Sequence, residues 1–296
     1  MCGLSGIIGF NRGENNGEGI VRNMISTLAH RGPDGHKIVI NNNNIYGFSR
    51  LAIIDLKKRS MQPMISKDKK YILSFNGEIY NYKELRKEIS DKYHFITESD
   101  SEVLMAVLIL WGLEGLEKVY GMFSFCFYDG KNNRHIFARD RFGQKPLFFS
   151  TEGSSFFYAS EIKALLAAGI SKNINYYSIS DYVVDGAIDY GKETFFSNIN
   201  QLEPGCFLII DSSSRLKHGR WYNLSKMKPN KLPKQKKELN EYILSTFNEV
   251  CAQHYNSDVP VGIALSGGLD SSSLLASSKE FKNDKVLLGE CLSGAL

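Results

Sequence analysis

Apolar and polar residues alternate over short stretches through the first 210 residues of the chain. These stretches are rich in β-branched and aromatic residues, which is typical of half-buried strands. The predicted strands are GLSGIIGF (3–10), KIVINNNNIYGF (37–48), RLAIIDL (50–56), YILSFN (71–76), FSFCFYD (123–129) and HIFARD (135–140). Asn132 and Asn133 separate the last two strands, as a hairpin turn requires.

Three stretches between these strands instead place apolar residues at helical spacing. The predicted helices are GEGIVRNMISTLAH (17–30), YKELRKEIS (82–90) and SEVLMAVLILWG (101–112). Ser99 and Glu102 have the spacing of a capping box for the third helix. Hairpins mixed with helices predict an α+β fold in which helices cover sheets.

A basic stretch, KMKPNKLPKQKK (226–237), interrupts this pattern and shows no apolar periodicity, so we interpret it as a solvated linker. Beyond it the order of elements changes to strand, loop, helix and strand, which predicts the start of a parallel α/β domain. The predicted elements are a helix over 238–255, a strand VGIALS (261–266), a helix SSSLLASSKEF (271–281) and a strand KVLLGE (285–290). The expected domains are 2–210, a connecting segment 211–236, and 237–296.

The net charge of +4 is spread along the chain, so nothing in it calls for nucleic acid or an acidic membrane as a partner. Five cysteines without CxxC spacing predict neither a disulfide framework nor a zinc or other metal site, and they favour a reducing compartment. The longest apolar run, VLMAVLILWGL (103–113), is shorter than the roughly 20 residues that span a bilayer. We therefore expect a cytoplasmic protein without a membrane segment.

The most distinctive chemical feature is a cysteine directly after the initiator methionine. Cys2 is either a chance residue at a frayed terminus or the first residue of the mature protein. If Met1 is removed, the new α-amine, with a pKa of about 7.7–8.0, can accept the thiol proton. The thiol would then be a nucleophile that needs no catalytic histidine.

Other polar residues allow two interpretations each. Arg50 is either an exposed strand arginine or a planar fork for a substrate carboxylate. The pair Asn76-Gly77 is either a hairpin turn or a strand-to-helix corner whose amide and backbone N–H hold an oxyanion. Asp100 is either a carboxylate in the first turn of a helix or the receptor for a substrate ammonium group. The loop LAHRGPDG (28–35) indicates a turn.

Seven motifs decide between these interpretations because together they resemble one family. They are MCGLSGIIGF, HRGPDG, GFSRLAIIDL, FNGEIYNY, ESDSE, ARDRFGQKPLFF and ASEIKALL. Their order and spacing resemble the amino-terminal domain of the glutamine-hydrolysing asparagine synthetases, which are class II, N-terminal-nucleophile amidotransferases. The resemblance covers nearly the whole chain and implies an αββα sandwich, with a homodimer as a reasonable expectation.

The resemblance also implies roles for individual residues. Cys2 attacks the side-chain amide of glutamine, and Asn76 with the Gly77 backbone stabilises the oxyanion. Arg50 holds the glutamine α-carboxylate, while Glu78 and Asp100 contact its amino group. The pocket is lined by Leu51, Ala52, Ile53 and Ile54. No cofactor is expected for this hydrolysis.

A second motif, IALSGGLDSSSLL (263–275), joins a predicted strand to a helix. It is either a Gly/Ser turn or a phosphate-binding loop, and it resembles the pyrophosphate loop of the ATP pyrophosphatases. In the family this loop binds ATP, with Mg²⁺ on the phosphates, to activate aspartate as an adenylate that ammonia attacks. The expected cradle is Leu265, Ser266, Gly267, Gly268, Leu269, Asp270 and Ser271.

The second predicted domain has too few strands for a doubly wound sheet. We therefore expect a truncated ATP-pyrophosphatase domain, and a chain that hydrolyses glutamine but does not make asparagine. Two alternatives remain open. One is an amidotransferase of the same architecture that amidates another carboxylate, and the other is a glutamine-binding module without catalysis.

Overall fold

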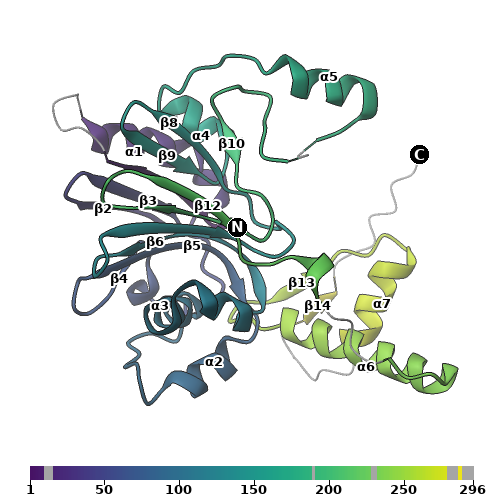
Figure 1. Cartoon of the computed structure of the whole chain (residues 1–296). Helices are drawn as coiled ribbons and strands as arrows, with labels where there is room; N and C mark the ends of the chain where they lie inside the picture. Colours follow the sequence, from purple (N-terminus) through teal and green to yellow (C-terminus); the bar gives the residue numbers. More distant parts are fainter. Residues whose placement is uncertain (10–15, 189–190, 228–231, 279–285, 289–296) are drawn as a thin grey trace. The chain divides into compact units, whose positions relative to one another are not determined.

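The computed structural model describes residues 1–9, 16–188, 191–227, 232–278 and 286–288 (Figure 1). The chain forms two compact units. The first contains Met1–Ala52 and Lys57–Leu224, and the second contains Ile53–Leu56 and Ser225–Leu296. The end of the helix predicted over 271–281, both ends of the strand predicted over 285–290, and Cys291 lie outside the described residues.

The first unit is built on two six-stranded sheets (Figure 1). In spatial order, the first sheet contains β10 (Asn200–Gln201), β8 (Phe148–Glu152), β9 (Ser155–Ala159), β1 (Gly3–Ile8), β3 (Asn44–Ser49) and β2 (His36–Asn41). The second contains β12 (Leu216–Arg220), β11 (Cys206–Ile210), β7 (Arg134–Arg139), β6 (Gly121–Asp129), β5 (Tyr71–Ile79) and β4 (Met64–Ile65). Neighbouring strands in both sheets are antiparallel.

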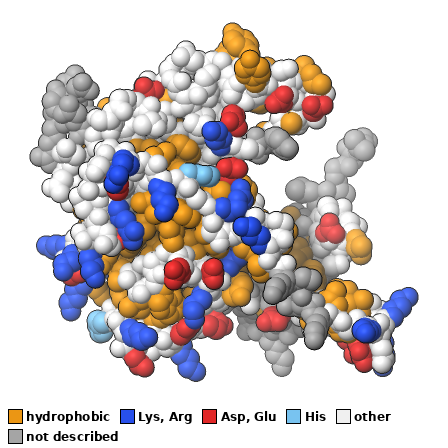
Figure 2. Space-filling view, viewed as in Figure 1, with side chains coloured by type: hydrophobic (Ala, Val, Ile, Leu, Met, Phe, Trp, Pro, Cys, Tyr) orange, Lys and Arg blue, Asp and Glu red, His pale blue; other side chains and the backbone are white. Residues whose placement is uncertain are grey.

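Helices cover the outer face of each sheet. The first sheet carries α1 (Gly17–Thr27) and α4 (Ile162–Ala167). The second carries α3 (Asp100–Trp111), and α2 (Tyr82–Ile89) packs against α3. These four layers confirm the predicted αββα sandwich (Figure 1). The remaining helix of this unit, α5 (Tyr176–Asp185), buries none of its residues. Figure 2 shows hydrophobic side chains gathered over this part of the surface. Tyr177 and Val183 of α5 are among the exposed hydrophobic residues.

The main core lies between the two sheets, because alternate residues of each strand face inward. Leu4, Tyr46 and Phe48 of the first sheet belong to the same buried cluster as Phe137 and Leu208 of the second. A separate apolar layer lies between α1, α4 and the first sheet. The six residues of β1 are all buried, because layers cover both faces of this strand. Leu4 and Ile8 face the core between the sheets, and Ile7 faces the layer under α1 and α4.

Two of the predicted strands are wrong in extent. The run 37–48 is a hairpin of β2 and β3, with Asn42 in the left-handed region at φ 53°. The run 50–56 forms no strand beyond an isolated bridge from Arg50 to Pro33. Its apolar residues resemble a strand, but Asp55 has φ 48°, which breaks an extended backbone.

The pair Asn76-Gly77 is neither a hairpin turn nor a corner. Both residues lie inside β5, which continues to Ile79, and Gly77 is opposite Phe123 of β6. A Cβ on residue 77 would lie 2.2 Å from the Met122 carbonyl oxygen. Glycine at this position therefore permits close approach of the two strands, instead of the backbone reversal that Asn-Gly usually indicates.

The second unit contains α6 (Lys236–His254), β13 (Val261–Ile263), α7 (Leu269–Ser278) and β14 (Val286–Leu288). β13 and β14 are parallel, which confirms the predicted parallel arrangement. The strand predicted over 261–266 ends at Ile263, and the following residues form the loop before α7. Cys251, Tyr255 and Ile263 form a small buried cluster. Among the described residues no helix is long and apolar enough to cross a membrane.

The loop after β7 is held by two buried charged residues. Arg139 donates to the carbonyl oxygens of Gly143, Lys145 and Leu202. Asp140, which is fully buried, accepts hydrogen bonds of 3.0–3.1 Å from four backbone N–H groups. These donors are Phe123, Phe142, Gln144 and Lys145. The carboxylate therefore fixes the chain that leads to Lys145.

We predict that Asp140→Ala lowers the free energy of unfolding by about 2–4 kcal/mol, because it leaves buried N–H groups without an acceptor. Urea unfolding followed by circular dichroism measures the change. Asp68→Ala is the matched control, because the exposed Asp68 accepts bonds that water can replace. Equal effects of the two substitutions would contradict the structural role of Asp140.

Candidate active site

The Cys2 thiol lies directly before β1 and packs beside the core between the sheets. Its Sγ is 3.4 Å from the backbone nitrogen of Leu51 and 3.5 Å from the carbonyl oxygen of the same residue. Burial raises the pKa of the Cys2 thiol, and the charge of Arg50 acts in the opposite direction. The thiol therefore needs a base close by to become a nucleophile.

The chain terminus beside this thiol is clamped by Arg31. Its Nε donates to the Cys2 carbonyl oxygen at 2.9 Å, and its Nη1 donates to Glu161 at 2.9 Å. Burial lowers the pKa of the Met1 α-amine, and the charges of Arg31 and Lys145 lower it further. An α-amine at this buried chain terminus is therefore neutral more readily than one in water, and a neutral amine can accept a proton.

The motif HRGPDG forms the loop that shapes the segment from Arg50 to Ala52. Asp34 N donates to Arg50 O, Arg50 N donates to Gly35 O, and Ala52 N donates to the Asp34 carboxylate at 2.7 Å. A Cβ on residue 32 would lie 2.3 Å from the Ser49 carbonyl carbon, so only glycine permits this contact. The loop thus holds the backbone that contacts the Cys2 sulfur.

Arg50 is buried, with 7% of its surface exposed, and its Nη1 donates to the Lys57 carbonyl oxygen at 3.0 Å. A guanidinium that is removed from water and held on one side by the backbone is a specific partner for a carboxylate. Of the predicted pocket lining, Leu51 and Ala52 lie in the first unit. Ile53 and Ile54 lie in the second unit, where the Ile53 carbonyl accepts from Asp258 N.

Asn76 brings an amide to the layer between the sheets. It shares the inward face of β5 with Ile72, four residues away, because side chains alternate along a strand. The residue is 1% exposed, and no described residue accepts a hydrogen bond from its Nδ2. A buried donor without a partner is costly, and such groups occur at sites that bind a ligand.

The Gly77 backbone N–H points away from β6, to the edge of β5 that β4 pairs only at Ile72 and Leu73. Phe75 N donates to Gln62 Oε1 and Ile79 N donates to Asp100 Oδ2, so alternate N–H groups of β5 point away from β6. Gly77 lies between these two residues and shares their direction. Its N–H and the Asn76 amide are therefore two donors at neighbouring positions of one rigid strand.

Asp100 is the first residue of α3 and is buried. Burial raises the pKa of Asp100 to about 7, and the charge of Glu78 raises it as well. Backbone hydrogen bonds, among them the one from Ile79 N, partly oppose this shift. The predicted capping box is half confirmed. Ser99 accepts from Glu102 N, but the Glu102 carboxylate accepts from Ile96 N and Thr97 N instead of from Ser99 N.

The loop of the second unit lies between β13 and α7. Gly267 has φ 78°, Gly268 N donates to Ser266 Oγ at 3.4 Å, and Ser266 N donates to Ser271 Oγ at 3.3 Å. Asp270 lies in the first turn of α7. Exposed backbone at the N-terminus of a ten-residue helix, after a parallel strand, fits a phosphate group.

The sequence of this chain matches two families. The family described as "Glutamine amidotransferase domain" matches residues 1–222. The chain belongs to this family. Residues 243–287 of this chain match the family described as "Asparagine synthase".

Curated relatives carry related names. This chain is 35% identical to "Asparagine synthetase [glutamine-hydrolyzing] 1" of Bacillus subtilis, and the match covers 95% of this chain and 44% of that protein. A putative asparagine synthetase of Methanocaldococcus jannaschii is 33% identical over 95% of this chain and 57% of its own length. "Amidase chry2" of Gibberella zeae is 30% identical over 93% of this chain and 42% of its own. The chain spans about half the length of these relatives.

Solved structures show the same fold. The glutamine phosphoribosylpyrophosphate amidotransferase of B. subtilis has a TM-score of 0.56 at 19% identity, with 97% of this chain and 65% of that one covered. A structure titled as the allosteric regulatory enzyme of purine biosynthesis has a TM-score of 0.58 at 18% identity, with 97% and 64% covered.

Arg31 and Lys145 are candidate site residues that the sequence analysis missed. Both lie in motifs quoted for the resemblance, HRGPDG and ARDRFGQKPLFF, but neither had been given a role. Lys145 is buried, and burial lowers its pKa, while the charge of Glu78 opposes this shift. The signal available in the sequence was a lysine five residues after Asp140, within the motif ARDRFGQKPLFF.

The raised pKa of Asp100 predicts a specific dependence of stability on pH. A folded-state pKa of about 7 lies above the value of about 3.9 in the unfolded chain, so the folded state binds the proton more tightly. Asp100 therefore stabilises the fold at acidic pH, and this contribution is lost as the pH rises through 7. The slope reaches at most about 1.4 kcal/mol per pH unit.

We expect the variant Asp100→Asn to lose less stability than the parent between pH 5 and pH 8, since Asn does not titrate there. Urea unfolding at both pH values, without glutamine, measures this difference. Asp91→Asn, on an exposed turn, should keep the parent's dependence. Parallel pH profiles for Asp100→Asn and the parent would rule out the buried, titrating carboxylate.

Proposed function

We propose that this chain hydrolyses the side-chain amide of glutamine at Cys2 and releases ammonia. The observation that carries the proposal is the position of the Cys2 thiol. It is held against Leu51 and packs beside the core between the two sheets, and the unpartnered Asn76 amide faces the same core. Membership of the glutamine amidotransferase family supports the choice of glutamine. The charges of Arg50 and Asp100, which both act on the Cys2 thiol, suit a substrate with a carboxylate and an ammonium group.

The proposed reaction begins after removal of Met1, when the α-amine belongs to Cys2 itself. The amine takes the thiol proton, and the sulfur attacks the amide carbon of glutamine. Asn76 Nδ2 and the Gly77 N–H donate to the oxyanion that forms. The carbon–nitrogen bond then breaks, and the amine returns its proton to the leaving nitrogen, which departs as ammonia. Water hydrolyses the thioester, which yields glutamate and restores the thiol.

The binding roles follow from charge. Arg50 would hold the α-carboxylate of glutamine, and Asp100 with Glu78 would receive its ammonium group. Binding of the ammonium favours the ionised form of Asp100, so substrate binding and proton release are coupled at this residue.

For the second unit we propose a part in asparagine synthesis, with ATP bound through Leu265–Ser271. The fit of the loop to a phosphate and the match to the asparagine synthase family support this role. ATP with Mg²⁺ would supply the activation of the aspartate carboxylate that ammonia attacks. A different carboxylate is the second candidate, because a relative of similar identity is named an amidase. A cytoplasmic location and a homodimer belong to the same proposal.

Replacement of the nucleophile tests the first reaction. We expect Cys2→Ala to abolish glutamate release from glutamine, measured with a glutamate dehydrogenase assay, while the circular dichroism spectrum stays unchanged. Cys251→Ala, in the small cluster of the second unit, should keep the parent rate. Mass spectrometry of the active parent should show a chain without Met1. Activity in Cys2→Ala, or in a chain that retains Met1, would refute the proposal.

The oxyanion role of Asn76 gives a quantitative expectation. Asn76→Ala should lower kcat by about 10²–10³, because the lost hydrogen bond forms only in the transition state, and KM should change little. Steady-state kinetics of glutamate release measure both constants. Asn23→Ala, on the exposed face of α1, is the control. A rise in KM with unchanged kcat would instead indicate that Asn76 binds the ground state.

A further inference from the structure

A tight turn precedes β11 and brings two potential metal ligands together. Cys206 N donates to the Glu203 carbonyl oxygen at 3.2 Å, which closes a four-residue turn. Its central residues are Pro204 and Gly205, and Gly205 has φ 65°. Proline followed by a glycine of positive φ is the pattern of a type II turn. The local sequence therefore places the Glu203 carboxylate near the Cys206 thiol.

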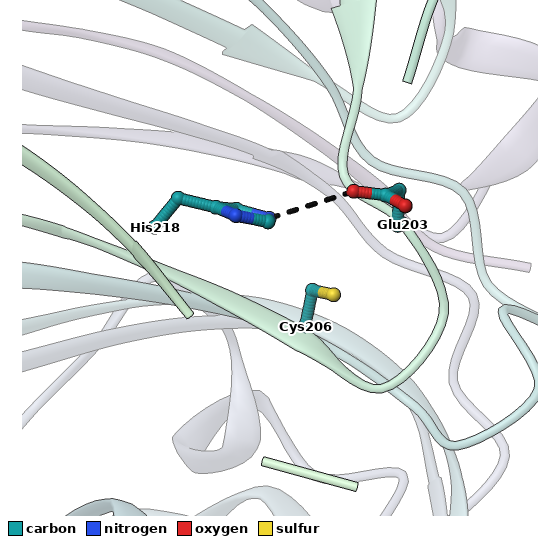
Figure 3. Close-up of side chains that lie close together, drawn as sticks. All are labelled: Glu203, Cys206 and His218. Carbon is teal, nitrogen blue, oxygen red and sulfur yellow. Dashed lines mark ion pairs between the residues drawn. The ribbon is translucent and has the colours of Figure 1, made fainter. Parts of the chain in front are cut away.

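The third potential ligand comes from the neighbouring strand. In the antiparallel pair of β11 and β12, Cys206 is opposite Arg220 and Leu208 is opposite His218. Alternate residues face the same side, so His218 is one diagonal step from Cys206 on one face of the hairpin. Figure 3 shows the His218 ring directed toward the Glu203 carboxylate, with the Cys206 side chain beside the two.

The separations between these groups are close to those in a metal site. His218 Nε2 is 3.7 Å from Glu203 Oε2, and the ligand atoms of all three residues lie within 4.8 Å of one another. Around a tetrahedral zinc ion, with bonds of about 2.0–2.3 Å, ligand atoms are roughly 3.3–3.8 Å apart. Small rotations of the three side chains would bring their ligand atoms to these separations.

Arg220 orients the Glu203 carboxylate. Arg220 Nη2 lies 3.5 Å from Glu203 Oε1, and its Nη1 donates to the Pro204 carbonyl oxygen at 3.0 Å. The guanidinium thus engages one carboxylate oxygen and leaves the other directed at His218. Carboxylates that bind metals are commonly held in this way by an outer hydrogen-bond partner.

We propose that Glu203, Cys206 and His218 bind a divalent transition metal ion, Zn²⁺ by preference, with water as the fourth ligand. A thiolate, an imidazole and a carboxylate form a donor set that suits zinc better than Mg²⁺ or Ca²⁺. The His218 side chain is 48% exposed, so an ion can enter from solvent. The ion would tie the edge strand β12 to the turn before β11. This proposal is independent of glutamine hydrolysis.

A cobalt titration of the full-length chain tests the site. We expect CoCl₂ to produce the near-ultraviolet charge-transfer band of a cobalt–thiolate bond, with one equivalent at saturation. Cys206→Ser should remove this band, and His218→Gln should weaken binding at least about tenfold. Cys251→Ser and His254→Gln are the matched controls and should retain it. Absence of the band in the parent, or its survival in Cys206→Ser, would overturn the proposal.

Thermal unfolding gives a second measurement that tolerates imperfect folding of Cys206→Ser. ZnCl₂ should raise the Tm of the parent and leave that of His218→Gln unchanged, because an ion that binds only the folded state stabilises it by mass action. His218 lies on an exposed edge strand, so its substitution should not impair folding. Equal Tm shifts in the parent and His218→Gln would also refute the site.

Discussion

The pairing of β1 with strands on both of its edges is the constraint on which the first unit depends. A strand within two residues of a chain terminus is usually free to fray. Here β9 and β3 satisfy its backbone on both sides, and all six residues are buried. The residue before the strand is therefore held in place, and Arg31 adds a bond to its carbonyl oxygen. A terminal thiol with a fixed position can be part of a site.

The ionisable groups around Cys2 share a second property, which is that the fold removes them from water. It raises the pKa of the Cys2 thiol and of Asp100, and it lowers the pKa of the Met1 amine and of Lys145. All four shifts favour the neutral form. A ligand that carries its own opposite charges would compensate for this cost, which is the property expected of a pocket for an amino acid.

Much of the fold could be predicted from local patterns. The alternation along β5 and β6, the helical spacing in α3 and the Ser99 cap are local signals, and the structure retains them. The run from Arg50 to Leu56 has the apolar residues of a strand, yet no strand forms. The backbone of Arg50 and Ala52 bonds the loop of Gly32–Gly35, and that of Ile53 bonds Asp258. Asn76-Gly77 shows the same limit, because the approach of β6 decided its conformation.

The sequence by itself determined an α+β class and the parallel start of the second unit, and its resemblance to a family implied the αββα sandwich and the candidates Cys2, Arg50, Asn76 and Asp100. These depend on periodicity and on motifs, which are properties of neighbouring residues. The tertiary structure alone decided that Arg31 bonds the Cys2 carbonyl oxygen, that Lys145 is buried, and that Glu203, Cys206 and His218 converge. Burial and distance between remote residues depend on how strands pair and sheets pack, and no local pattern specifies that packing.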